Sequence, residues 1–152
     1  MKTKSEFIVS ATIAILFLWV TTGSNNGNES SSLNKKLASE IQKKAEIGYN
    51  IVQAELGNMK ELLLVEPNRL IFKNLKNEVL TIYKDETGLA VLKESTGIAN
   101  VLPLQLEELT FSYSPTSEQI EIVFKTGRSI THSSGVKTQY SGTASGSISV
   151  TD

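Results

Sequence analysis

The chain has 152 residues, a formal net charge of -1, a single histidine and no cysteine. The near-neutral charge disfavours nucleic acid as a partner, because nucleic-acid-binding surfaces are strongly basic. Without cysteine there is no disulfide framework, thiolate nucleophile or thiolate metal ligand, and one histidine cannot build a histidine-rich metal site. The length beyond the first 32 residues suffices for one domain with one core.

Residues 7–23, FIVSATIAILFLWVTTG, form an uncharged apolar run behind a short head, residues 1–6, that carries Lys2 and Lys4. As a helix this run would extend about 25 Å, slightly less than the roughly 30 Å of a bilayer core. We interpret it as a transmembrane signal anchor; the alternative is a secretory signal peptide cleaved after the small residues at 21–23. In both cases the lysines favour a cytoplasmic N-terminus and an extracytoplasmic C-terminal part.

A flexible linker is predicted at residues 24–32, which are rich in Ser, Asn and Gly. From residue 33 to about residue 64, apolar residues recur every three or four positions, which predicts an amphipathic helix. The residues on its apolar face are Leu37, Ile41, Ala45, Gly48, Val52, Leu56, Met59 and Leu63. Gly57-Asn58 offers an earlier end for this helix. Its apolar face either packs against partner subunits or covers the domain's own sheet, and we favour the second.

After Pro67 the period changes to that of β-strands. Five segments rich in β-branched and aromatic residues alternate with turn-like sequences, which predicts an antiparallel β-meander at 69–73, 78–84, 89–93, 104–113 and 119–125. The predicted fold class is therefore α+β: an N-terminal transmembrane helix, then an amphipathic helix packed on the meander in a globular domain over 33–125. We expect Phe72, Phe111, Tyr113, Ile122 and Phe124 to be buried beneath Ile41, Val52 and Leu56. The tail, residues 126–152, is predicted to be polar and rich in loops, with one further strand at 147–150.

No pattern in the sequence indicates catalysis or cofactor binding. Asp85 and Glu86 lie in a predicted turn but are too few for a calcium loop. His132 precedes Ser133 and Ser134, but adjacency in sequence does not give the geometry of a nucleophile and its base. Phosphate-binding and dinucleotide-binding motifs are absent from the sequence. We therefore predict a protein that is not an enzyme, has no cofactor or metal and takes no small-molecule substrate.

An apolar N-terminal segment followed by an amphipathic helix and antiparallel strands resembles the layout of type IV pilin-like proteins. From Asn68 to Phe124 the segments NRLIFKN, EVLTIYKDETGLAVLKES, LPLQLEELTFSYS and QIEIVFK are similar to the strand series of minor pilins and type II secretion pseudopilins. Tyr83, Leu89 and the Leu-x-Phe-x-Tyr series of residues 109–113 stand at the positions that carry this similarity. Glu6 opens the apolar run with no glycine before it, so the usual prepilin cleavage motif is missing.

The resemblance implies a membrane-anchored, pilin-like structural subunit of a type IV pilus or secretion filament. Such a subunit would contact membrane lipid and other pilin-like subunits. By the same resemblance, Glu6 would be an assembly residue that pairs with a neighbour's N-terminal amine inside a bundle of helices. The alternative is a tethered extracytoplasmic binding module that joins no filament.

Overall fold

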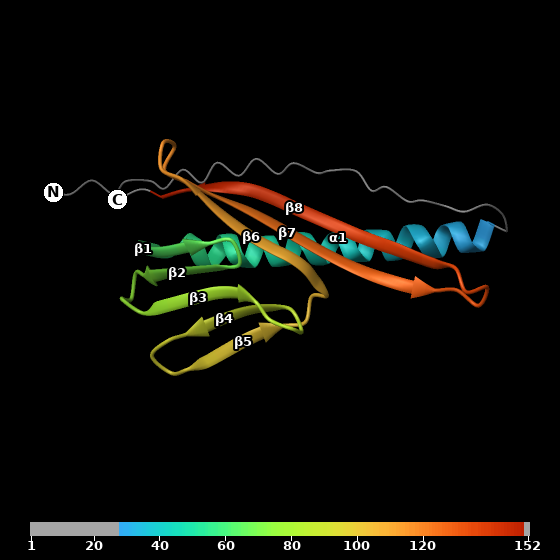
Figure 1. Cartoon of the computed structure of the whole chain (residues 1–152), viewed down its shortest axis with the longest axis horizontal. Coiled ribbons are helices and arrows are strands. Elements are labelled where there is room, and N and C mark those ends of the chain that lie inside the picture. Colours follow the sequence, from blue (N-terminus) through green and yellow to red (C-terminus); the bar gives the residue numbers. More distant parts are fainter. Residues whose placement is uncertain (1–27, 151–152) are drawn as a thin grey trace.

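The computed structural model describes residues 28–150, which form one helix and eight strands (Figure 1). The elements are α1 (Asn28–Leu56), β1 (Met59–Glu66), β2 (Arg69–Asn74), β3 (Val79–Lys84), β4 (Leu89–Lys93), β5 (Ile98–Leu102), β6 (Leu106–Ser114), β7 (Gln119–Thr131) and β8 (Lys137–Ser149). The predicted transmembrane segment at 7–23 lies outside the described residues. Within 28–150, no helix combines the length and the apolar sequence needed to cross a membrane.

The predicted fold class was wrong, because antiparallel strands dominate the described chain and they form two sheets instead of one meander. Sheet A has the order β1-β2-β3-β4-β5, and sheet B has the order β6-β7-β8. The chain leaves sheet A at residues 103–105, where Pro103 has no N–H to donate to a ladder and Gln105 has a φ of 54°. This corner makes β6 the first strand of a second sheet, which the pattern of strands alone does not reveal.

The apolar stripe of α1 is buried as expected from Ile41 to Leu56, in about the last five turns of the helix. Ile41, Ala45, Val52 and Leu56 are almost fully buried, and the C-terminal half of α1 shares one core with the inner faces of both sheets. Phe72, Phe111, Ile122 and Phe124 are buried in this core with Val52 and Leu56, as predicted. Ile41 was expected to cover them too, but it packs in a second cluster with Ala38 and Tyr140. Tyr113 is not: it is 41% exposed, because it lies beside the β6–β7 turn at the end of its sheet.

The predicted helix was wrong beyond Leu56. The N–H of Gly57 donates to the carbonyl of Gln53, and the side chain of Asn58 donates to the carbonyl of Ala54, which closes the last turn. Residues 59–66 form β1 instead, although Met59 and Leu63 continue the helical spacing. Leu63 is the extra residue of a β-bulge and is 44% exposed.

The predicted linker was wrong for residues 28–32, which belong to α1. Ser and Asn are poor helix formers, but extending a helix that is already packed adds one hydrogen bond for each residue fixed. Further along the same helix, Asn34 accepts a hydrogen bond from the Tyr140 hydroxyl of β8 at 2.7 Å. Tertiary contact therefore supports the N-terminal part of α1.

The predicted loop-rich tail was also wrong, except that the strand expected at 147–150 forms the end of β8. Residues 126–131 complete β7, and residues 137–149 form β8, paired with β7 along its whole length. The small residues that suggested a loop are required by packing: a Cβ on Gly142 would lie 2.6 Å from the Cα of Gln42, and Ala144 is buried. Small side chains on β8 let α1 approach the sheet closely.

Polar contacts fasten α1 to sheet B. The buried Thr126 hydroxyl donates to the carbonyl of Ile41 at 2.9 Å. The side-chain amide of Gln42 donates to the carbonyl of Thr143 and accepts from its N–H, both at 3.1 Å. Gln42 thus satisfies backbone groups that β8, an edge strand, presents away from β7. These hydrogen bonds join α1 to the β7–β8 hairpin, and sheet A lies beside the C-terminal half of α1 (Figure 1).

Candidate functional site

Sheet A has a second face, directed away from the core. Leu70, Phe72, Leu80 and Ile82 face inward, and because successive side chains of a strand alternate, the residues between them face outward. Cross-strand pairing aligns these outward residues in two neighbouring rows. One row is Leu64, Ile71, Thr81, Leu92 and Ala99, and the other is Arg69, Tyr83, Ala90 and Val101. The outer face is therefore largely apolar along both rows.

A depression of about 320 Å³ lies on this outer face. Its apolar lining comes from Ile71, Tyr83 and Leu92, three neighbouring strands of the sheet. Its polar lining is Asn68, Arg69, Thr81, Lys84 and Glu94. A shallow hollow with an apolar floor and a polar rim suits an apolar side chain of a ligand or partner better than a charged one.

The charged groups around the depression already have partners. Arg69 donates to Glu66 at 2.6 Å, and this carboxylate raises the pKa of the guanidinium above its usual value. Lys84 donates to the backbone carbonyl of Glu107 on β6 at 2.7 Å. The buried Thr81 hydroxyl donates to Glu94 at 2.8 Å. These contacts fix the shape of the rim and offer no free acid–base pair at the depression.

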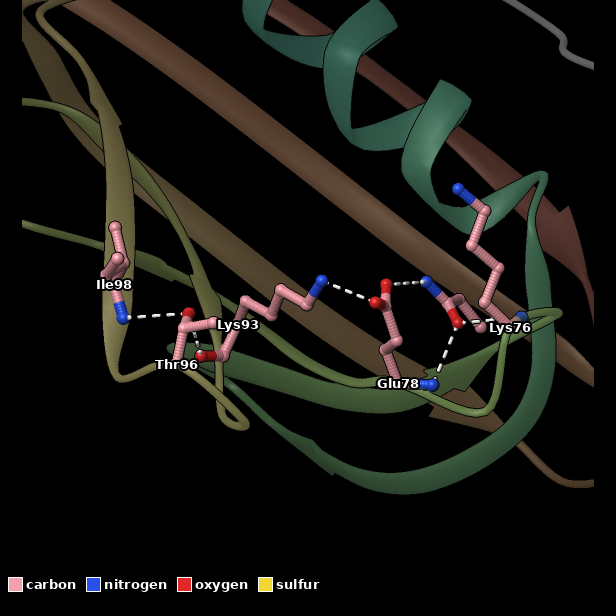
Figure 2. Close-up of polar contacts among 6 residues, drawn as sticks. Lys76, Glu78, Lys93, Thr96 and Ile98 are labelled. Carbon is pink, nitrogen blue, oxygen red and sulfur yellow. Dashed lines mark hydrogen bonds and ion pairs between the residues drawn. The ribbon is translucent and has the colours of Figure 1, made fainter.

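A second polar cluster orders the turns at one end of sheet A. Glu78 accepts hydrogen bonds from Lys93 and from the side chain of Asn74, and together these lower the pKa of its carboxyl group, the contact with Lys93 contributing most. Figure 2 shows the side chain of Lys93, the last residue of β4 before the β4–β5 turn, extending to Glu78. In that turn Thr96 donates to the carbonyl of Lys93 and accepts from the N–H of Ile98. The cluster holds the β4–β5 hairpin against the β2–β3 turn.

The residues considered for chemistry lie apart from one another. Glu6 lies outside the described residues. His132 is exposed in the β7–β8 turn and bonds Thr138 at 2.8 Å, not Ser133 or Ser134. Asp85 accepts from the backbone N–H of Glu86 in the β3–β4 turn. Across residues 28–150 no three His, Asp or Glu side chains gather so as to hold a metal ion.

The sequence did not predict the depression. Its lining comes from three strands and from the β1–β2 and β4–β5 turns. Only the register of those strands places Ile71, Thr81 and Leu92 in one row. A signal was nevertheless present: β3 and β4 carry apolar residues at inward and outward positions alike, as in Leu80 to Tyr83 and Leu89 to Leu92. A strand that is apolar on both sides indicates that its outer face also makes contacts.

Comparison with protein-family models, with curated proteins and with solved structures finds no match to this chain.

Proposed function

We propose that this protein is a non-catalytic structural subunit, attached to the cell membrane by residues 7–23 and displaying its folded part outside the cell membrane, as minor pilins and pseudopilins do. The uncharged run at 7–23 behind Lys2 and Lys4 supports membrane attachment. Four residues, 24–27, separate this run from the first residue of α1. Its partners would be membrane lipid and other pilin-like subunits.

The observation that carries the proposal is the length and fastening of α1. Its 29 residues extend about 43 Å. Hydrogen bonds accepted by Asn34 and Ile41 and donated by Gln42 hold its N-terminal half to the β7–β8 hairpin. The end of α1 nearest the apolar segment is thus part of the rigid fold, while sheet A lies beside the other end (Figure 1). This arrangement presents sheet A at a fixed distance from the N-terminal half of α1.

Cysteine crosslinking tests the proposal cleanly, because the chain has no native cysteine. Single substitutions Ala11→Cys, Ile15→Cys and Leu18→Cys in the full chain, in its own membrane, should form crosslinks to a second copy or to pilin-like neighbours. Glu6→Ala should weaken them if Glu6 is the assembly residue. The matched control is Thr116→Cys in the β6–β7 turn, which should not crosslink. Absence of crosslinks at all three positions, with the protein membrane-bound and functional, would contradict the subunit proposal.

The depression on sheet A favours a second candidate, a tethered binding module that joins no filament. In that case the outer face of sheet A is the functional surface and residues 7–23 only attach it. Leu92→Glu would then abolish the protein's function in cells while membrane attachment stays unchanged. Thr116→Glu places the same charge on an exposed turn away from sheet A and should leave function intact. Function that survives Leu92→Glu would exclude this candidate.

A further inference from the structure

The outer strands of the two sheets differ in how well they are protected against pairing with another strand. Gln42 of α1 covers the backbone of β8, as described above. The N–H of Phe111, on β6, donates to the carbonyl of Pro67 at 3.0 Å. In β1 the register with β2 is broken twice, and the strand carries Lys60, Glu61 and Glu66. Bulges and charges of this kind are common protections of sheet edges.

The fifth strand, β5, has none of these protections. Its sequence, Ile-Ala-Asn-Val-Leu, contains no charge and no proline, and its register with β4 is regular at all five positions. Ile98 is 63% exposed and Val101 is 38% exposed. Figure 1 shows β5 as the last strand of sheet A, with no element of the described chain along its outer side. An uncharged, regular and partly apolar edge is a template for a further strand.

Contacts within the chain order the edge strand β5 in the absence of a partner. Lys93 at the end of β4 is tied to Glu78, and Thr96 fixes the first residue of β5 through the N–H of Ile98 (Figure 2). Ordering a segment in advance lowers the entropic cost of binding. The polar cluster at the end of sheet A thereby prepares β5 for pairing.

We propose that β5 pairs antiparallel with β5 of a second copy of this chain, about a two-fold axis at Asn100. The strand is complementary to itself in that register: Ile98 meets the second copy's Leu102, and Ala99 meets the second copy's Val101. No like charges face each other, which would destabilise such a pair, and each contact occurs twice, as a two-fold interface requires. The two five-stranded sheets then form one continuous sheet whose apolar outer rows join.

A five-residue edge buries less surface than the roughly 1,200–2,000 Å² of stable complexes. We therefore expect weak, concentration-dependent pairing that benefits from confinement in a membrane. The inference stands apart from the proposed function, because it uses no residue of 7–23 and holds for a filament subunit and a tethered module alike.

Disulfide trapping in the full chain, in membranes, tests the pairing and its register. Directly opposed residues of antiparallel strands have Cα atoms about 4.5–5.5 Å apart, within the roughly 4.4–6.8 Å that a disulfide spans. Asn100→Cys should therefore form a dimer under mild oxidation. Ile98→Cys alone should not, because the two copies of residue 98 lie four positions apart, roughly 13 Å along the strand. Ala99→Cys mixed with Val101→Cys should crosslink, whereas neither alone should.

A charge substitution provides a second test of the pairing between the two β5 strands. Asn100→Lys, introduced into both the Ala99→Cys and the Val101→Cys chains, places two like charges on the two-fold axis. It should reduce the yield of the crosslink between these chains to the background yield of Thr116→Cys. Thr116→Lys adds the same charge away from β5 and should leave the yield unchanged. The inference is overturned if folded Asn100→Cys fails to dimerise, if Ile98→Cys dimerises equally well, or if Asn100→Lys has no effect. A crosslink from Asn100→Cys to a different protein also overturns it, since the occupant is then not a second copy.

Discussion

Replacing Gly142 by alanine tests the contact between α1 and β8. The added Cβ would lie 2.6 Å from the Cα of Gln42, 2.8 Å from its N atom and 2.8 Å from the carbonyl oxygen of Ile41. All three are backbone atoms of α1, so no side chain can move aside. Since non-bonded carbon atoms sit about 3.5–4.0 Å apart, α1 must shift by roughly 1 Å.

Such a shift of α1 should lower the free energy of unfolding by an amount that can be estimated. Overpacking of this kind destabilises proteins by about 1–3 kcal/mol. It also stretches the bonds from Thr126 to Ile41 and between Gln42 and Thr143, each worth about 1 kcal/mol. We expect Gly142→Ala to lower the free energy of unfolding by about 2–4 kcal/mol.

The assay is urea unfolding of the full chain in detergent micelles, followed by far-UV circular dichroism, together with hydrogen exchange of residues 38–45. The matched control is Gly57→Ala, where the nearest atoms lie at 3.4 Å and the backbone is not left-handed. This control should be neutral or gain up to about 1 kcal/mol. If Gly142→Ala stays within about 0.5 kcal/mol of the wild type and exchange in α1 is unchanged, α1 is not seated on β8 as described.

Two further predictions concern the core and the surface of sheet A. Phe111→Ala removes a buried ring between the sheets and should cost about 3–5 kcal/mol, measured by the same unfolding assay; a near-neutral result would show that β6 faces the core differently. The pKa values of Glu78 and Glu61 are lowered, mainly by hydrogen bonds from Lys93 and Lys73. Because a lowered pKa in the folded state stabilises only while the carboxylate is charged, this contribution is present above the reference pKa of 4.5 and is lost as pH falls through the lower folded value. Glu78→Gln should thus destabilise at pH 7 and differ less from the wild type at pH 3; a difference that grows on acidification would refute the assigned role.

The sequence predicted the elements with strong periodicity. The helical spacing from Leu37 to Leu56 and the five strands rich in β-branched and aromatic residues are present in the structure. The helix was predicted to continue to about residue 64 because Met59 and Leu63 continue the three-and-four spacing by coincidence; it ends instead at the alternative end, Gly57-Asn58. Only the turn formed at Gly57-Asn58 separates them from α1.

The sequence did not predict the features that depend on small residues, on a chain corner or on strand register instead of on a periodic pattern of large apolar side chains. β8 was missed over residues 137–146 because Gly142 and Ala144 are small where α1 approaches, and composition alone does not distinguish this from a loop. The division into two sheets depends on the corner at Pro103 and Gln105. The depression depends on strand register, which sets the neighbours of Thr81 across the sheet.

Site-specific labelling tests the claim that the protein is attached to the membrane with its folded part outside. In spheroplasts, a membrane-impermeant maleimide should label Thr116→Cys, an exposed position, whereas Lys2→Cys should be labelled only after the membrane is permeabilised. The full-length protein should stay with the membrane on alkaline extraction. A soluble mature protein that begins near Ser24 would contradict the claim and identify residues 1–23 as a cleaved signal peptide.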